Sequence, residues 1–143
     1  MKIKYLFLLF ALILFGFQCN RQSKNTDEVI DFFFHYVKNG EYEKIESLRS
    51  QVFTNDPEGD KFHFARLHNL LIEHGIPSKD NWKIRYDTTH EILKMKIYSI
   101  VIYKEFDQKR KRDEGAVIDF TFDYERTHTG DSIMFYNLHS LWD

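Results

Sequence analysis

Seven histidines and a single cysteine are the side chains of this 143-residue chain that most readily bind metals or act as nucleophiles. Three of them, His63, His68 and His74, share one predicted helix at separations of five and six residues. Two ligands on one helical turn need a separation of three or four, as in H-E-x-x-H. We therefore predict no metal site, unless scattered ligands assemble one. We also expect no cofactor, because the chain has no glycine-rich phosphate loop, G-x-S-x-G motif or nucleotide fingerprint.

His139 is the best candidate for acid–base chemistry, which needs a histidine or a perturbed carboxylate inside an apolar pocket. In the last predicted strand, His139 shares one face with Phe135, Asn137 and Leu141. The opposite face looks more like core. We therefore favour a surface or hydrogen-bonded histidine over a catalytic one, and assign no catalytic residue.

Two carboxylates of the preceding strand, Asp119 and Asp123, alternate with Phe120 and Phe122. Successive side chains of a strand point to opposite faces. If the phenylalanines face the core, both carboxylates are predicted to be solvated, which makes them poor candidates for a catalytic group.

A basic run, Lys109-Arg110-Lys111-Arg112, lies between two predicted strands and is flanked by Asp107, Asp113 and Glu114. The simplest interpretation is a solvated hairpin tip. The alternative is contact with acidic lipid headgroups or another anionic surface. The formal net charge of −2 argues against a dedicated nucleic-acid-binding protein, so we expect no nucleic-acid partner.

The N-terminus has the pattern of a targeting segment. Lys2 and Lys4 precede Tyr5 to Phe17, a run of 13 residues without charge. That run is shorter than the ~20 residues that span a bilayer as a helix, and it has the length of a signal-peptide core. Cys19 follows almost directly, with no small-x-small cleavage site before it.

This arrangement resembles the signal of a bacterial lipoprotein. The resemblance implies a signal peptide over residues 1–18, a lipid on the thiol of Cys19, and a polar tether over residues 19–25. It further implies a cell-envelope protein, periplasmic or otherwise extracytoplasmic, that a lipid anchor attaches to the membrane. Two alternatives stay open: an incidental Cys19 behind a conventionally cleaved signal, and an uncleaved short anchor.

Residues 26–143 are predicted to form one α+β domain, whose first half is helical. The first helix begins near Asn25, which forms a capping-box pattern with Glu28, and stops at Asn39-Gly40. The second spans about 42–52. After a turn at 56–59, the third spans about 60–74 and ends at Gly75. Its expected buried face consists of Phe64, Leu67, Leu70 and Leu71.

The second half is predicted to form an antiparallel sheet. Residues 82–87 alternate as in a half-buried strand, and 97–103 are apolar enough for a central strand. Residues 117–125 and 133–141 form the last two strands, joined by a loop at 127–131. Short connections between consecutive strands imply antiparallel pairing.

Several segments resemble the nuclear transport factor 2-like (cystatin-like cone) superfamily, in particular its small bacterial envelope lipoproteins of unknown function. These segments are VKNGEYEKIESL, LHNLLIEHGIPSKDNW, IVIYKEF, VIDFTFDY and MFYNLHSL. The resemblance implies N-terminal helices packed on a curved antiparallel sheet that encloses a conical cavity.

The resulting hypothesis is a non-catalytic binding or interaction domain with a protein partner or a small apolar ligand. Phe33, Tyr36, Phe120 and Phe122 are the candidate ligand-binding residues, because aromatic side chains commonly line apolar pockets. The alternative, implied by the superfamily, is an isomerase or dehydratase-type enzyme that uses a histidine or tyrosine lining the cone.

Overall fold

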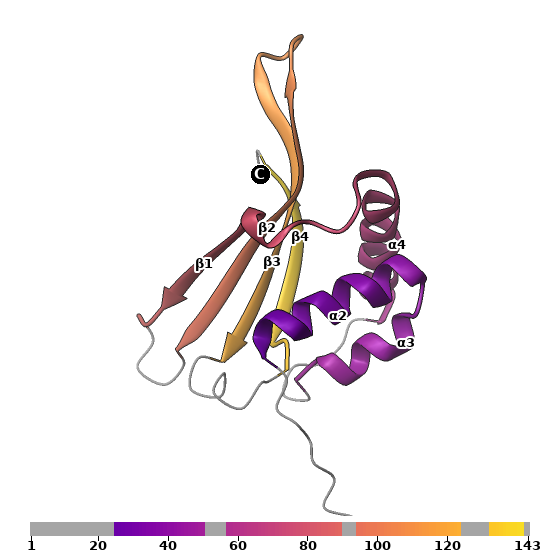
Figure 1. The fold of residues 1–143 in the computed structure, drawn as a ribbon, viewed down its shortest axis with the longest axis vertical. Coiled ribbons are helices and arrows are strands. Elements are labelled where there is room, and N and C mark those ends of the chain that lie inside the picture. Colours follow the sequence, from indigo (N-terminus) through magenta and orange to yellow (C-terminus); the bar gives the residue numbers. More distant parts are fainter. Residues whose placement is uncertain (1–24, 51–56, 90–93, 124–131, 142–143) are drawn as a thin grey trace, which may run out of the picture.

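The computed structural model describes residues 25–50, 57–89, 94–123 and 132–141, which form an α+β fold as predicted. Helices lie against one face of a four-stranded antiparallel sheet with strand order β1-β2-β3-β4 (Figure 1). The elements are α2 (Thr26–Asn39), α3 (Tyr42–Ile45), η1 (Glu46–Leu48), α4 (Pro57–His74), η2 (Lys79–Asn81), β1 (Trp82–Asp87), β2 (Met95–Asp107), β3 (Arg112–Asp123) and β4 (Phe135–Ser140). Residues 1–24, with the signal segment and Cys19, lie outside the described residues.

Helix α2 begins and ends where the sequence predicts. The Asn25 side chain accepts a hydrogen bond from the backbone of Asp27, and the Glu28 carboxylate accepts one from the Asn25 backbone, which completes the capping box. Gly40 ends the helix in the left-handed conformation (φ 72°), which glycine adopts without steric cost.

The second helix is shorter than predicted. It consists of α3 and one turn of 3-10 helix, after which Arg49 is extended (φ −95°, ψ 149°). The reason is a tertiary contact, since Leu48 and Ser50 exchange backbone hydrogen bonds with Ile133. Val52, the last residue of the predicted stripe, lies outside the described residues.

Helix α4 begins at Pro57, so the prediction of a turn through residue 59 was wrong. Proline is well suited to the first position of a helix, where its missing N–H is not needed. The buried face is largely as expected: Phe64, Leu67 and Leu71 are buried. Gly75 ends the helix with a φ of 82°. Among the described residues, no helix is long and apolar enough to cross a membrane.

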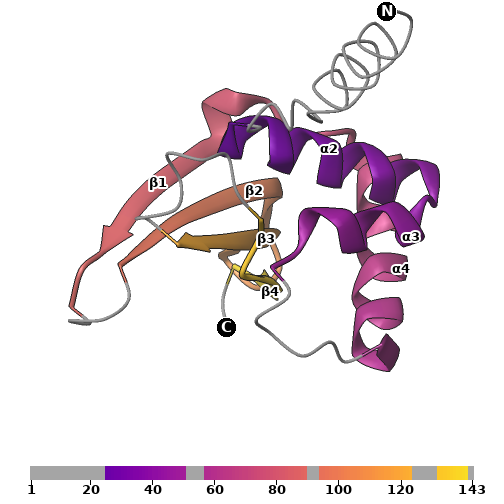
Figure 2. The ribbon, with the colours of Figure 1, turned by 90° about the horizontal axis from the view of Figure 1, so that it is seen from below.

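The core lies between the sheet and the helices (Figure 2). Cross-strand register places Ile100 beside Ile118, and Tyr98 beside Phe120, on the inner face that α2 covers. The buried cluster draws on residues from Val29 to Leu138. Among the described residues the cluster begins at Val29, and a fragment of residues 20–143, which keeps every described residue, is expected to fold by itself.

Strands β2 and β3 are longer than predicted. Their pairing continues from Val101 and Val117 out to Asp107 and Arg112, so the basic run forms the tip of a hairpin, as expected. This hairpin projects beyond the rest of the domain (Figure 1). The predicted loop at 127–131 lies outside the described residues.

Candidate functional site

Three of the four predicted ligand-binding residues lie together in the core. Phe33, Phe120 and Phe122 are fully buried, and the rings of Phe33 and Phe120 meet edge to face at 4.9 Å between centroids. Tyr36 is half-buried at the margin of the same core, and its ring stacks on Phe32 at 6.0 Å. The three buried rings therefore belong to the packed core, and Tyr36 packs against its edge.

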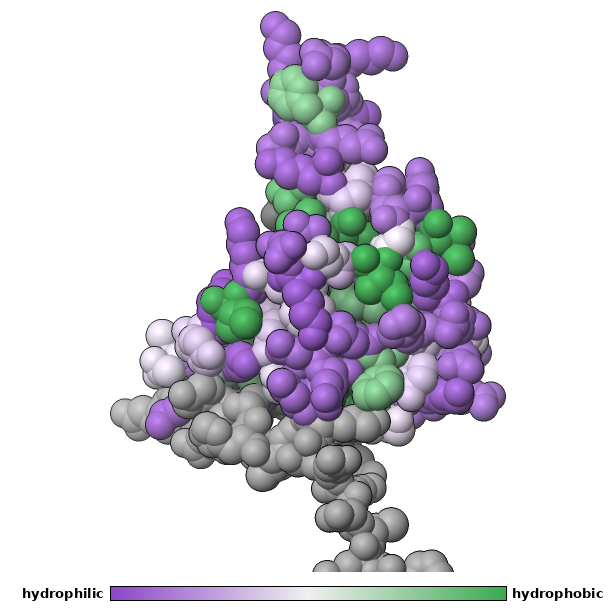
Figure 3. Space-filling view, viewed as in Figure 1, coloured by the Kyte–Doolittle hydropathy of each residue, from purple (hydrophilic) through white to green (hydrophobic). Residues whose placement is uncertain are grey.

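The inner face of the sheet continues past the helices at β1. In one row across the sheet, Ile84 is 48% exposed, whereas its neighbours Tyr98 and Phe120 are fully buried. In the next row, Tyr86 is 57% exposed. The half-buried strand predicted here is therefore mostly exposed, because the helical layer ends above β2 and β3. Figure 3 shows apolar surface over β1 among hydrophilic side chains.

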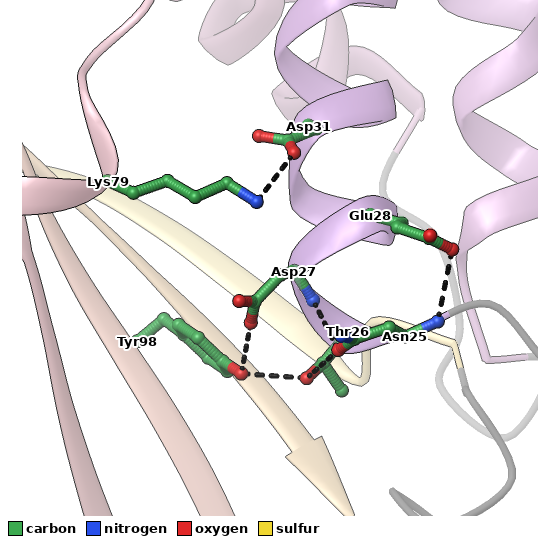
Figure 4. Close-up of polar contacts among 7 residues, drawn as sticks. All are labelled: Asn25, Thr26, Asp27, Glu28, Asp31, Lys79 and Tyr98. Carbon is green, nitrogen blue, oxygen red and sulfur yellow. Dashed lines mark hydrogen bonds and ion pairs between the residues drawn. The ribbon is translucent and has the colours of Figure 1, made fainter.

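A hydrogen-bonded cluster marks the boundary between the covered and open parts of this face (Figure 4). The phenol of Tyr98 donates to Asp27 Oδ1 at 2.8 Å and lies 2.7 Å from the hydroxyl of Thr26. Both partners come from the first turn of α2, which the Asn25 cap holds in place. Lys96 lies over the Tyr98 ring, with its Nζ 4.7 Å from the centroid and 3.4 Å from Thr26 Oγ1.

The tyrosine in this cluster is a hydrogen-bond donor rather than an acid. Burial raises the pKa of the Tyr98 phenol well above its usual range, and the adjacent Asp27 carboxylate raises it further. The phenol therefore stays protonated at physiological pH. Efficient proton transfer needs a pKa near the working pH, so the arrangement fits binding better than acid–base catalysis.

Trp82, the first residue of β1, packs against Tyr98 at the edge of this cluster. Its ring meets that of Tyr98 edge to face at 5.9 Å, and Lys79 Nζ lies 5.3 Å from its centroid. Lys79 also pairs with Asp31 of α2 at 3.0 Å, which links η2 to the helix (Figure 4). The indole N–H of Trp82 is buried and has no hydrogen-bond partner within the described ranges.

We call the surface formed by Trp82, Ile84, Tyr86 and Lys96, which ends at the buried Tyr98, the open inner face. Sequence analysis did not select any of these residues as a candidate for binding. One usable signal was the phenol of Tyr98 in the apolar segment IYSIVIY, since a buried tyrosine hydroxyl normally requires a hydrogen-bond partner.

His139 lies on the outer face of the sheet, away from the helices. Its Nδ1 is 3.1 Å from the Ser140 carbonyl, and its Nε2 is 3.5 Å from Asp119 Oδ2. Asp119 also lies 3.9 Å from Arg85. The prediction that Asp119 is solvated was wrong: its side chain is 23% exposed, because neighbouring strands supply His139 and Arg85 on the same face. Asp123 is likewise half-buried.

The three helical histidines have separate structural surroundings. His68 Nδ1 lies 2.9 Å from the Val37 carbonyl near the end of α2, and the His74 ring stacks on Tyr103 at 4.3 Å. His63 has a buried Nδ1 without a partner among the described residues. Within the parts of the chain that the structure describes, no three metal-binding side chains come together.

A second polar cluster joins three distant segments at the α4 side of the sheet. Arg49 Nη1 pairs with Asp60 Oδ2 at 2.6 Å, and the Tyr136 phenol donates to the other oxygen of Asp60. Burial, the largest single influence, opposes the charge of Arg49, but the hydrogen bond with Asp60 and the attraction of Asp60, Tyr136 and Glu46 together outweigh it and raise the pKa of the guanidinium. All three groups are satisfied by one another, so this cluster has a structural role.

Comparison of the chain with protein-family models, with curated proteins and with solved structures finds no match.

Proposed function

We propose that this chain is a lipid-anchored protein of the bacterial cell envelope whose domain binds a small apolar ligand through the open inner face. The anchor is supported by the two lysines, the apolar run and Cys19 at the N-terminus. The observed order of helices followed by an antiparallel sheet is compatible with the nuclear transport factor 2-like cone, which we propose as the fold family.

The observation that carries the binding proposal is the abrupt change in burial along one row of the inner face. Tyr98 is fully buried, whereas Ile84 beside it is half exposed to solvent. An apolar row that continues beyond its covering helices favours an apolar ligand, because burying that surface is worth about 25 cal/mol per Å². Tyr86 and Lys96 border the row and provide hydrogen-bonding groups.

The lipid anchor can be tested by metabolic labelling of the full chain with a fatty-acid analogue. Wild-type protein should incorporate the label, and Cys19→Ala should not, because the chain contains no other cysteine. Ser23→Ala, in the same segment, serves as the matched control and should be labelled like wild type. Equal labelling of wild type and Cys19→Ala would refute the anchor.

The binding face can be tested with the fluorescent apolar probe anilinonaphthalene sulfonate and the fragment of residues 20–143. Ile84→Glu should weaken probe binding at least about tenfold, which corresponds to about 1.4 kcal/mol. Ile72→Glu is the matched control, because Ile72 is a 61% exposed isoleucine on α4. If both variants bind the probe like wild type, or lose it equally, the open inner face is not the site.

A further inference from the structure

The hairpin formed by the ends of β2 and β3 projects as a separate arm of the molecule (Figure 1). Residues 104–107 pair with 112–115 in regular antiparallel register, and none of the described helices covers them. An extension of this kind adds nothing to the core cluster, which on these strands ends at Ile102 and Ala116. Its residues are therefore available for contact with a partner.

The tip of this arm is ordered by its own hydrogen bonds. The Asp107 carboxylate accepts from the backbone N–H of Lys109 at 2.7 Å and of Arg110 at 3.1 Å. The bond from Arg110 holds the pKa of Asp107 below its usual range. Lys111 completes the turn in the left-handed conformation, with a φ of 51°. A preorganised turn of this kind loses little conformational entropy on binding.

Some cations of the hairpin form ion pairs with carboxylates, and others do not. Lys104 pairs with Asp113 at 2.7 Å, and Arg110 pairs with Glu114 at 2.6 Å. In contrast, no ion pair joins Lys109 or Lys111 to a carboxylate in the part of the chain that the structure describes. Residues 107–112 contain four cations and one carboxylate, a local charge of 4 − 1 = +3.

An exposed aromatic side chain, Phe106, lies opposite Asp113 in the same hairpin, one residue before Asp107. Phe106 is 54% exposed, and an apolar patch stands out near the hairpin tip among hydrophilic side chains (Figure 3). An exposed aromatic side chain with charged side chains around it matches the composition of protein interfaces, which have an apolar centre and a polar rim.

The direction of the arm indicates where the partner lies. Helix α2 begins near the end of the molecule opposite the hairpin tip (Figure 1). Under the proposed lipid anchor, the seven residues 19–25 span at most about 25 Å. The anchored end therefore faces the membrane, and the tip points away from it.

We infer that the hairpin tip is a docking surface for an acidic region of another protein, with Phe106 entering an apolar pocket and Lys109 and Lys111 pairing with carboxylates at its rim. A lipid surface fits less well. Under the proposed anchor the tip points away from the membrane, and carboxylates at Glu105, Asp113 and Glu114 lie among its cations. A fixed pattern of paired and unpaired charges instead suits a complementary protein surface.

The test is photocrosslinking in cells that produce the full chain, with p-benzoylphenylalanine in place of Phe106. The matched position is Phe62, which is 68% exposed on α4. We expect a discrete protein adduct at position 106 and none at position 62. The crosslinked partner peptide, identified by mass spectrometry, should contain more carboxylates than cations.

The charge requirement is tested in the same cells with Lys109→Glu combined with Lys111→Glu. This pair should reduce the adduct at position 106 at least tenfold, whereas Lys61→Glu combined with Lys83→Glu, of equal charge change, should not. Adducts with lipid alone, no adduct, a neutral or basic partner peptide, or equal effects of the two pairs would overturn the inference. Fatty-acid labelling at Cys19 reports on the anchor independently.

Discussion

The hydroxyl group of Tyr98 is buried on the inner face of β2 and donates a hydrogen bond to the first turn of α2, 71 residues away in sequence. Leaving such a group buried and unpaired would cost about 1–3 kcal/mol. The contact therefore fixes where the N-terminus of α2 lies on the sheet, and it defines the boundary of the open inner face.

The raised pKa of Tyr98 leads to a prediction for alkaline pH. Because folding raises the pKa of this phenol, its contribution to stability is complete below the unfolded value, about 10, and falls as the pH rises above it. Tyr98→Phe should lower the free energy of unfolding by about 1–2 kcal/mol at pH 8. The difference from wild type should shrink at pH 11.

Urea unfolding of the fragment of residues 20–143 at the two pH values provides the measurement. Tyr103→Phe is the control, since that hydroxyl makes no hydrogen bond among the described residues, and it should change stability little at pH 8. A Tyr98→Phe deficit that stays constant from pH 8 to pH 11 would contradict the assignment.

At the scale of elements, the β2–β3 hairpin depends on a residue without a side chain. A Cβ at Gly115 would lie under 3.0 Å from the Tyr103 carbonyl oxygen and from Leu141 Cδ1. The leucine side chain can move, but the carbonyl belongs to the β2 backbone beside a register shift between Val101 and Tyr103. The hairpin therefore requires glycine at this position for close approach of the strands.

We predict that Gly115→Ala lowers the free energy of unfolding by about 1–3 kcal/mol and loosens the hairpin. Amide hydrogen exchange should accelerate in residues 103–115 more than in the helices. Gly40→Ala is the control: it has open space but a φ of 72°, so its cost of about 1–2 kcal/mol should fall on the end of α2. The same exchange pattern in both variants would argue against the steric explanation.

At the scale of the whole molecule, two polar clusters connect the helices to the sheet. The Tyr98 cluster joins α2 to β2, and the Arg49–Asp60–Tyr136 cluster joins the segment after η1, α4 and β4. Between them, packed aromatic rings fill the core. Polar contacts with defined geometry select one arrangement of the layers, whereas apolar packing alone tolerates several.

Asp60→Ala should therefore be among the more destabilising substitutions outside the apolar core. It leaves a mostly buried Arg49 and a Tyr136 hydroxyl without their shared partner, at a cost of about 3 kcal/mol or more in urea unfolding. Glu46→Ala removes the other, exposed partner of Arg49, at 3.4 Å, and should cost less than about 1 kcal/mol. Similar losses of stability in both variants would contradict the cooperative role assigned to the Arg49–Asp60–Tyr136 cluster.

Local patterns in the sequence predicted much of the fold. The capping box at Asn25 and the stops at Gly40 and Gly75 depend on a few adjacent residues, and the structure confirms them. The alternation of Ile118, Phe120 and Phe122 likewise predicted the buried face of β3. These features depend on backbone conformation and on periodicity, which neighbouring residues determine.

Other features depend on contacts between distant segments. The early end of the second helix follows from the pairing of Arg49 with Ile133, and the burial of Asp119 from side chains on two other strands. The open inner face exists because the helical layer ends before β1, which no local pattern in residues 82–87 expresses. The proposed N-terminal signal and its Cys19 are by contrast inferred from the sequence alone, since they are read from a linear pattern of charge, apolar length and one thiol. Tertiary packing decided how far the helices extend over the sheet, because this extent depends on contacts between the two layers.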